Sequence, residues 1–518
     1  MERTRYWVCR LLLCLVVGGL VGCALPPLYG RTVSSALSIS EAHDTSLGRA
    51  FAPLVRAHPG KSGIYSLADA HDAFATRVLL TRTAEKTLDV QSYIWHGDVT
   101  GTLMLEEVRT AADRGVRVRL LLDDNGTAGL DDELATLHSH PNIEVRLFNP
   151  FVVRSPKFIG YLTDFKRANR RMHNKSYTAD NQATIIGGRN IGDEYFGAGS
   201  VLFADLDVLA VGPVVDDVSR DFDLYWASES SYPVDLILPQ AAASSLETLA
   251  KTGETMAASK AASEYTQAVI RSKFVAGLES GSLTFEWAET TMISDDPAKG
   301  LGKATRDSLL VSQLGDMLRM PQESVDLVSP YFVPTAAGVE YFADLVANGV
   351  RVRVLTNSLA ATDVAAVHAG YAKRRKDLLE ANIVLWEMRP VSGASGGSGS
   401  GGSAPFGSSG SSLHAKTFAV DGKRIFVGSF NFDPRSARFN TELGFIIESP
   451  KMAREIETSF DDAIPKSSYE VLLSDKGSVY WVERKDARII RHDSEPETGL
   501  FKRSLVWLLS ILPIEWML

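Results

Sequence analysis

Hydrophobic and polar positions along this chain follow one order of helix and strand patterns, and that order occurs twice. In each half, an apolar strand pattern precedes an amphipathic helix that ends at a glycine, and a second apolar strand follows. The predicted elements are strands 88–95 and 116–122 with helix 103–114 in the first half, and strands 325–332 and 350–355 with helix 339–348 in the second. Alternating strands and helices favour a largely parallel sheet covered by helices, so the sequence predicts a duplicated α/β unit.

Each unit also contains the same pattern of polar residues, H-x-K-x4-D-x6-G-[GS]-x-N. The two copies begin at His173 and His414, which are 241 residues apart, and both read as β-hairpins with the aspartate in the turn. A two-residue turn at 421–422 would place Ser429 opposite His414, and the same register places Gly188 opposite His173. The His, Lys and Asn side chains would then share one face, with a small residue leaving room for a substrate.

The residue types on this face suit chemistry at a phosphate. Lys175, Lys416, Asn190 and Asn431 can neutralise and hydrogen-bond phosphate oxygens. One imidazole can attack phosphorus while the other protonates the departing alcohol, because two histidines with pKa values near ~6.5 can hold opposite protonation states. The lysines supply the positive charge, so no metal or other cofactor is expected. Two ordinary hairpins with satisfied polar residues are the alternative interpretation.

The doubled pattern resembles the phospholipase D superfamily of phosphodiesterases and phosphatidyltransferases, and every signature position matches in both copies. The resemblance implies two phospholipase D-like α/β sandwich domains with one active site at their interface. The catalytic set that it implies is His173, Lys175, Asp180, His414, Lys416 and Asp421. The two aspartates would mainly shape the turn or hold a neighbouring segment. Family analogy makes His173 the nucleophile and His414 the acid and base.

The resemblance also implies a carboxylate that orients the catalytic imidazole, since such a hydrogen bond fixes the tautomer and stabilises the imidazolium. Asp205 and Glu442 follow the two motifs in strand patterns and are the candidates, with Asp207 as an alternative to Asp205. A second acidic pair, Asp123 and Asp124, follows a predicted strand. A polar strand-end loop is the favoured interpretation there, because no histidine stands at metal-ligand spacing.

The length of 518 residues and the duplicated pattern suggest two cores with short attached segments. The predicted divisions are a signal peptide 1–22, a tether 23–60, domain 1 over 61–235, a helical connector 236–280, domain 2 over 281–490 containing a Gly/Ser-rich loop 392–412, and a C-terminal segment 500–518. Residues 285–293 read as one strand that opens the second unit. The Gly/Ser loop ends beside His414, which favours a mobile lid or lipid-access loop using Phe406 over an inert linker.

Both chain ends carry patterns typical of membrane association. Arginines, a short apolar run and Leu-Val-Gly-Cys at 20–23 resemble a bacterial lipoprotein signal, which implies cleavage before Cys23 and lipidation of that residue. An uncleaved helical anchor is the alternative. A basic pair, tryptophans and a proline make 500–518 suit a membrane interface rather than a span, or else a tail packed on its own domain. The predicted location is the bacterial envelope, anchored by lipid and facing the periplasm, with inner and outer membranes both open.

Net charge constrains the partners. The chain carries a formal charge of −9, which argues against a general nucleic-acid binder. A local basic cluster, Lys166, Arg167, Arg170 and Arg171, precedes His173 and is interpreted either as a solvated loop or as an anionic-headgroup contact. Phospholipids and a membrane are therefore the expected partners, and the sequence identifies no helper protein.

Several features together resemble the cardiolipin synthase C group of bacterial synthases over about residues 60–518, including Leu-Thr-Asn-Ser-Leu-Ala at 355–360 and Leu-Pro-Ile-Glu-Trp at 512–516. This resemblance implies a phosphatidyltransferase that makes cardiolipin from two phospholipids through a phosphatidyl-histidine intermediate. Hydrolysis of phospholipids to phosphatidic acid, as by a phospholipase D, is the alternative. A secreted nuclease is disfavoured by the acidic chain and the anchor, and a non-enzymatic lipoprotein by the complete motifs.

Overall fold

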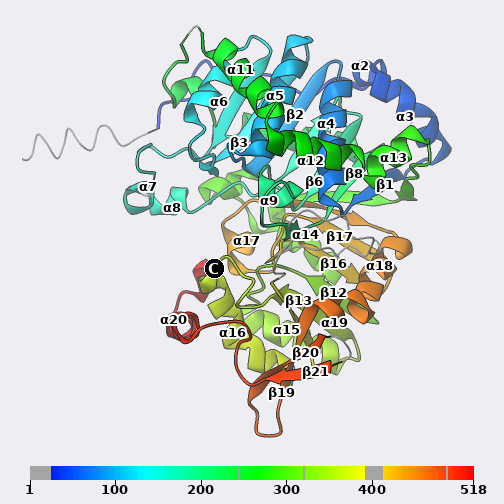
Figure 1. Ribbon diagram of the computed structural model, residues 1–518, viewed down its shortest axis with the longest axis vertical. Coiled ribbons are helices and arrows are strands. Elements are labelled where there is room, and N and C mark those ends of the chain that lie inside the picture. The colour runs from blue at the N-terminus through cyan, green and yellow to red at the C-terminus, as the bar shows by residue number, and fades with distance from the viewer. Residues whose placement is uncertain (1–24, 158, 243, 319–320, 391–411, 486–487) are drawn as a thin grey trace, which may run out of the picture.

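The computed structural model describes residues 25–518 apart from 158, 243, 319–320, 391–411 and 486–487. Two lobes follow one another along the chain, and each is built around one large mixed sheet (Figure 1). The predicted signal peptide, the predicted lipidation site Cys23, and the Gly/Ser loop up to residue 411 with Phe406 lie outside the described residues.

The first lobe has a central parallel group of strands with antiparallel strands on both sides. Its strands are β1 (Ser62–Leu67), β2 (Thr87–Ile94), β3 (Arg117–Gly126), β4 (Ile143–Phe148), β5 (Ser176–Ala179), β6 (Ala183–Gly187), β8 (Asp207–Val211), β9 (Ser231–Pro233) and β10 (Glu286–Ala288). Their order across the sheet is β10-β1-β8-β6-β5-β2-β3-β4-β9. Its helices are α4 (Ala70–Thr83), α5 (Val99–Asp113), α6 (Asp131–His138), α7 (Ile159–Thr163), α8 (Phe165–Ala168), α9 (Asp193–Phe196) and α10 (Val214–Ala227).

The second lobe repeats this arrangement. Its strands are β11 (Thr290–Ser294), β12 (Ser324–Val328), β13 (Arg351–Asn357), β14 (Val384–Met388), β16 (Thr417–Val420), β17 (Arg424–Gly428), β18 (Leu443–Ile447), β19 (Ser468–Leu473), β20 (Val479–Lys485) and β21 (Arg488–His492). Their order is β11-β18-β17-β16-β12-β13-β14-β19-β20-β21. The helices are α14 (Leu310–Leu318), α15 (Thr335–Ala347), α16 (Ala365–Glu380), α17 (Pro434–Arg438), α18 (Pro450–Asp461), α19 (Ala463–Ser467) and α20 (Leu500–Ile511).

The duplicated α/β fold predicted from the sequence is confirmed. In each lobe the parallel strands, β2-β3-β4 or β12-β13-β14, are joined to the antiparallel motif hairpin, β5-β6 or β16-β17. Apolar residues of both lobes share one buried cluster next to the hairpins, in which Ile186 of β6 and Val208 of β8 meet Ala415 and Val427 of the second motif. The lobes are therefore held together by a continuous core next to the two motifs, which fixes the motifs relative to one another.

The chain passes from one sheet to the other within a few residues. The single strand predicted over 285–293 is wrong: it divides at Glu289 into β10, which pairs with β1, and β11, which pairs with β18. The alternating pattern continued across the division because both strands have one buried face. Before this crossing, α11 (Ser245–Ala257), α12 (Lys260–Ile270) and α13 (Lys273–Glu279) pack on the first lobe in the stretch predicted as a helical connector.

The described part of the predicted tether is folded against the first lobe. It forms α2 (Ile39–His43) and α3 (Ser46–Ala57), and Arg31 donates hydrogen bonds to the carbonyl oxygens of Ala227, Ser228 and Ser231. The tether prediction is therefore wrong from Arg31 onward. The amphipathic pattern of α3 was overlooked, and the carbonyl groups that Arg31 contacts lie 196 to 200 residues further along the chain, where local periodicity cannot reveal them.

The C-terminal segment also packs on its own lobe. Val506 of α20 is buried beside Leu359 and Ala369, and Glu515 of the terminal turn η4 (Glu515–Met517) pairs with Arg374. This arrangement corresponds to the alternative interpretation of a packed tail, although many of its apolar side chains remain exposed. In the described part of the chain, no helix combines the length and hydrophobicity needed to cross a bilayer.

Candidate active site

Each motif folds as an antiparallel hairpin. In the second motif, the hydrogen bond that closes the turn lies one residue inside the first pair of the strands. Lys423 N donates to Val420 O across Asp421 and Gly422, which have positive φ values of 56° and 57°. This confirms the predicted two-residue turn. Pairing then resumes at Val420 with Arg424, so Lys423 is an extra residue and the predicted register is wrong by one position.

The aspartates of the two motifs lie at the turns, at the far end of each hairpin from the histidine. Asp180 accepts hydrogen bonds from the backbone N–H groups of residues 85–87, and Asp421 accepts them from residues 322–324. Each carboxylate thus fastens its turn to the residues that begin β2 or β12. The structure does not bring either aspartate to the imidazoles.

The two histidines are held across the lobe boundary. His173 Nδ1 lies 2.8 Å from Glu442 Oε2, and His414 Nδ1 lies 2.6 Å from Asp205 Oδ2. Each carboxylate therefore comes from the opposite lobe. Backbone bonds strengthen the crossing, since His173 N donates to Thr441 O and His414 N to Ala204 O. With Nδ1 engaged, Nε2 of each ring is the nitrogen left for chemistry.

The small residues predicted opposite the histidines serve the carboxylates instead. A Cβ at Gly188 would lie 2.1 Å from Asp205 Oδ1, so the glycine makes room for that carboxylate. Ser429 Oγ donates to Glu442 Oε2 at 2.5 Å. The proposed role of these positions in leaving substrate space is therefore wrong. The alternative carboxylate Asp207 is paired with Arg77 at 2.8 Å and does not contact a histidine ring.

The two lysines are buried beside the histidines. Lys175 Nζ donates to His173 O at 2.6 Å, and Lys416 Nζ lies 3.0 Å from Nδ1 and 3.3 Å from Nε2 of His414. Burial lowers the pKa of Lys175 to about 7 and that of Lys416 to about 8, because removing an ammonium group from water disfavours its charged form. Two such lysines form a site suited to a substrate anion. The negative charge of a bound phosphate would favour the protonated form of both lysines.

The two asparagines differ in how fully they are bonded. Asn190 Oδ1 accepts from Ile94 N at 3.1 Å, and its Nδ2 donates to the Tyr195 hydroxyl at 2.9 Å. Asn431 Oδ1 is buried without a hydrogen-bond partner among the described residues. A buried polar atom without a partner is costly unless a ligand satisfies it. Asn431 is thus the amide better placed to contact a substrate.

The two carboxylates are buried to the same degree, but their surroundings shift their pKa values in opposite directions. Burial raises the pKa of Glu442 to about 7, against the opposing effects of Lys175 and Ser429. Burial alone would also raise the pKa of Asp205, but His414, Lys416 and Arg189 hold it below its usual value. Asp205 is therefore ionised at neutral pH, whereas Glu442 is close to its midpoint.

The histidines follow the same asymmetry. Burial, with the charges of Lys175 and Lys416 and the nearby His414, holds the pKa of His173 well below its usual value. Burial and Lys416 also lower the pKa of His414, but Asp205 opposes that shift. Both rings are held at the boundary between the lobes by carboxylates of the opposite lobe, and His414 is the ring whose environment better supports a proton.

This paired architecture agrees with comparison to known proteins. The sequence model of the family described as cardiolipin synthase, PLD-like domain, matches residues 80–226 and 314–464, one stretch in each lobe. The chain belongs to this family. Cardiolipin synthase C of Escherichia coli K12 is 49% identical over 475 residues, covering 91% of this chain and 99% of that protein. The recognition of a phospholipase D-like enzyme from the sequence is confirmed.

More distant relatives agree with this assignment. A cardiolipin synthase of Listeria monocytogenes serotype 4a is 25% identical over 426 residues, which cover 81% of this chain and 72% of that protein. The crystal structure of a phosphatidylserine synthase from Haemophilus influenzae Rd KW20 matches 88% of this chain and 95% of its own, with a TM-score of 0.57. At 13% identity, that likeness shows the shared fold alone.

Aromatic side chains that the sequence did not indicate surround the imidazoles of this family member. Tyr93 lies edge-on to His173 with ring centroids 5.0 Å apart, and Tyr195 lies edge-on to His414 at 5.2 Å. Phe203 stacks on the His414 ring at 5.3 Å and also contacts Tyr195 at 5.2 Å. The rings fix the orientation of both imidazoles and keep water away. In the sequence, the only signal for these aromatic residues is their location in a predicted strand or close to a motif.

Acidic groups elsewhere have structural partners. Asp123 pairs with Arg171, while Asp124 pairs with Arg154 and Lys157. The predicted strand-end loop is wrong, because both aspartates lie within β3, which continues to Gly126. His96, Asp98 and Glu194 lie close enough together to hold a cation. Asp98, however, already caps α5 and accepts from Asp193 N, so this cluster has a structural explanation.

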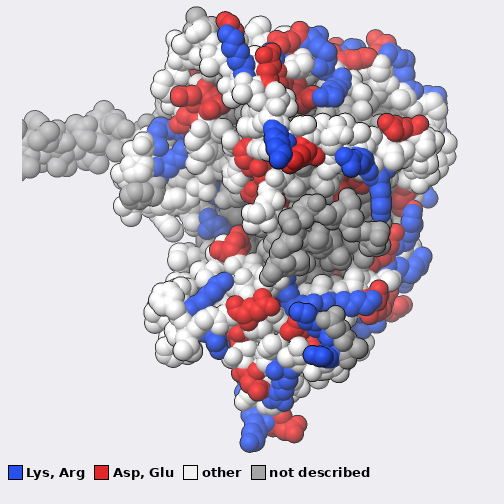
Figure 2. Space-filling view, viewed as in Figure 1, with Lys and Arg blue, Asp and Glu red and all other residues white. Residues whose placement is uncertain are grey.

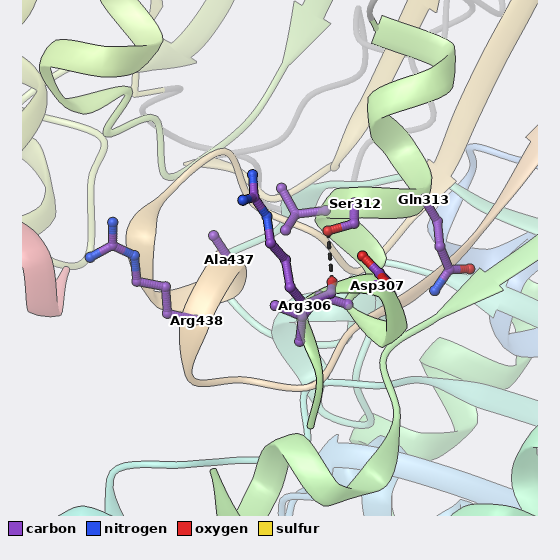
Figure 3. Close-up of a pocket in the computed structure, with 8 residues that line it drawn as sticks. Arg306, Asp307, Ser312, Gln313, Ala437 and Arg438 are labelled. Atoms are coloured by element: carbon purple, nitrogen blue, oxygen red, sulfur yellow. Dashed lines mark hydrogen bonds between the residues drawn. The ribbon is translucent and has the colours of Figure 1, made fainter. Parts of the chain in front are cut away.

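A surface depression of about 880 Å³ lies beside α17, between that helix and α14 (Figure 3). Its lining residues are Arg306, Asp307, Leu309, Val311, Ser312, Gln313, Ala437 and Arg438. No residue of either motif lines it. The active site of this cardiolipin synthase family member is therefore assigned from the convergence of the two motifs, not from the depression.

Proposed function

We propose that this chain is a phosphatidyltransferase that makes cardiolipin from two phospholipids through a phosphatidyl-histidine intermediate. The observation that carries the proposal is the pair of buried histidines, each held at Nδ1 by a carboxylate of the opposite lobe and each beside a lysine. The similarity to Escherichia coli cardiolipin synthase C over nearly the whole chain supports the choice of acceptor.

The geometry supports His173 as the nucleophile. Its low pKa keeps Nε2 unprotonated and able to attack the donor phosphorus, forming a P–N bond as the P–O bond to the headgroup breaks. His414, supported by the ionised Asp205, gives its proton to the departing alcohol. The same imidazole then removes the proton from the glycerol hydroxyl of a phosphatidylglycerol acceptor, whose oxygen displaces His173 from phosphorus.

Positive charge for these steps comes from the lysines. Lys175 and Lys416 would hold the non-bridging phosphate oxygens, where negative charge concentrates in the transition state. Asn431, with its unpartnered amide oxygen, can contact the phosphate or the acceptor hydroxyl. Both polar atoms of the Asn190 amide already form hydrogen bonds within the protein. Its main role would be to hold its neighbours in place, and one N–H group remains for the phosphate.

Exclusion of water supports transfer over hydrolysis. Only 7% of His173 is exposed, and Glu442 and Asp205 are buried. A phosphatidyl-histidine formed here would be shielded from bulk solvent. Water would then attack it slowly, which leaves time for a lipid hydroxyl group to react. Association with the bacterial envelope, a lipid anchor at Cys23 and exposure to the periplasm remain parts of the proposal that follow from the sequence.

Lipid product analysis tests the proposal directly. The wild-type chain and His173→Ala would be expressed in a bacterial host that lacks cardiolipin, and the lipids would be extracted and quantified. Cardiolipin is expected with wild type only, and a folded His173→Ala protein in the membrane fraction is the control. Accumulation of phosphatidic acid without cardiolipin would instead establish phospholipase D hydrolysis by the same site.

A further inference from the structure

Exposed apolar side chains are concentrated on α20 in the second lobe, and two more lie on the neighbouring short helices α7 and α8 of the first lobe. In the first lobe, Leu162 of α7 and Phe165 of α8 are 78% and 46% exposed. In the second lobe, Phe501, Trp507 and Ile511 of α20 are 84%, 66% and 59% exposed. Such side chains rarely gather on a monomeric surface unless it contacts a partner or a membrane.

These helices lie on the same side of the molecule. Figure 1 shows α7 and α8 projecting from the first lobe and α20 from the second, with the C terminus between them. The outline in Figure 2 is hollowed between the lobes on that side. Together, α7–α8 and the segment from α20 to η4 are called here the apolar rim.

Direct contacts connect the two halves of the rim. Arg435 of α17 donates to the side chain and backbone oxygens of Asn169, just after α8, while its own N–H donates to Leu518 O. Phe439 lies 5.3 Å from the Arg170 guanidinium and 6.2 Å from the Trp516 ring. Residues next to the rim therefore connect its two halves across the lobe boundary.

The rim is also connected to the active site. The Tyr161 hydroxyl of α7 donates to Asn125 Oδ1, and Asn125 contacts the hydroxyl of Tyr93, whose ring packs on His173. On the other lobe, α17 begins three residues after Asn431. The first half of the rim is thus linked to His173, and the second half is linked through Arg435 of α17 to the segment that follows Asn431.

The inner face of the tail is fixed, so its apolar outer face has a defined direction. Arg374 holds Glu515 through paired hydrogen bonds, and Val506 is buried. Lys166 of α8 and Lys502 of α20 have no ion-pair partner among the described residues. Apolar side chains flanked by unpaired lysines complement the surface of a membrane that contains anionic lipids.

We infer that the apolar rim is a docking surface for an anionic phospholipid bilayer, inserted from both lobes at once. This inference rests on the proposed function, because a lipid substrate must pass from the bilayer to the buried histidines. It extends the predicted interfacial tail by assigning α7–α8 as its partner in the first lobe. The bilayer then lies against the boundary between the lobes, where the two motifs meet.

Site-specific fluorescence tests the orientation. An environment-sensitive probe would be attached to Leu162→Cys, Leu508→Cys and, as a control, Ile489→Cys in the full chain. Ile489 on β21 is 77% exposed, as much as Leu162, but lies outside the rim. The unsubstituted chain, labelled identically, gives the signal from Cys9, Cys14 and Cys23.

With vesicles that contain phosphatidylglycerol, the probes at 162 and 508 should shift to the blue and be quenched by spin-labelled lipids, while the probe at 489 should stay in water. A water-like signal at 162 with a lipid-like signal at 508 would overturn the two-lobe surface in favour of the tail alone. Water-like signals at both positions would overturn docking by the rim altogether.

Activity measurements separate this inference from the proposed function. Leu162→Ser/Phe165→Ser should lower cardiolipin formation on vesicles by ~10-fold, since two apolar side chains no longer enter the interface. The same variant should keep its rate on a short-chain phospholipid dispersed as monomers, and Ile489→Ser should match wild type on both. Equal rates on vesicles would overturn the rim, whereas a wild-type chain that makes no cardiolipin would overturn the proposed function.

Discussion

The two halves of the active site share one motif but differ in charge. On one side, His414 faces an Asp205 whose pKa is held below its usual value by surrounding cations. On the other, His173 faces a Glu442 whose pKa is raised to about 7 by burial. Duplication alone would give two equivalent rings. The environment of each carboxylate makes one ring the better proton carrier and the other the better nucleophile.

The largest expected difference concerns the two histidines and the leaving group. His173→Ala and His414→Ala should each lower cardiolipin formation by ~10³-fold or more. With a donor that carries p-nitrophenol, which leaves without a proton, His414→Ala should still release a burst of one p-nitrophenol per enzyme. His173→Ala should release none. A burst from His173→Ala but not from His414→Ala would reverse the assignment.

Substitution of the carboxylates tests the origin of the difference. Asp205→Asn removes an ionised partner of a protonated imidazole and should lower the rate by ~10³-fold or more. Glu442→Gln replaces a group that is half-protonated near neutral pH, and should lower the rate only ~10-fold. Steady-state rates on mixed micelles give both values, with melting temperatures as the control for folding. Equal losses would mean that the two pairs are electrostatically equivalent.

The asparagines should separate activity from stability. Asn431→Ala should lower kcat/KM by ~10²-fold, as expected for a lost transition-state contact, while the melting temperature changes little. Asn190→Ala should destabilise the fold by about 1–3 kcal/mol, since it leaves Ile94 N–H and the Tyr195 hydroxyl without their partner. Thermal unfolding beside kinetics distinguishes them, and the reverse pattern would exchange their roles.

The lysines predict a pH limit. A lysine whose pKa is lowered keeps its charge only below that pKa. The value of kcat/KM should therefore fall by about tenfold per pH unit above the pKa of Lys175, about 7, and more steeply above that of Lys416, about 8. Lys175→Arg stays charged and should move the fall to about pH 8, whatever its absolute rate. An unchanged midpoint in this variant would exclude Lys175 as the titrating group.

The smallest difference between the two halves is expected for substitutions of the turn aspartates, because the two turns have the same hydrogen-bond pattern. Asp180→Asn and Asp421→Asn should each cost about 1–3 kcal/mol of unfolding free energy, because each carboxylate accepts several backbone hydrogen bonds. The activity of the folded fraction should remain within a few fold of wild type. Loss of activity without loss of stability would give these aspartates a direct catalytic role.

The features predicted correctly from the sequence are those that depend on residues close together in the chain. The duplicated strand and helix order depends on periodicity within each element, and the motif residues stand at fixed spacing. The turn at Asp421 and Gly422 was also recognisable, since both residues tolerate positive φ. The extra residue Lys423 left no such signal, so the register was missed.

Features that depend on distant contacts could not be predicted in the same way. Asp205 and Glu442 were recognised as candidate carboxylates, but nothing in their spacing indicates that each one serves the histidine of the other lobe. The aromatic rings around the imidazoles come from three separate segments, at Tyr93, Tyr195 and Phe203. The packing of Arg31 onto the first lobe likewise joins residues far apart in sequence.

The crossing of the two carboxylates also governs when this protein can begin to act. A chain emerging during synthesis completes its first motif long before Glu442 exists, so His173 has no partner to fix its tautomer. Until the second lobe folds and docks, neither imidazole is oriented. A chain that ends before Glu442 therefore lacks an assembled site, and a chain cut between the lobes should regain its chemistry only when the two fragments reassociate.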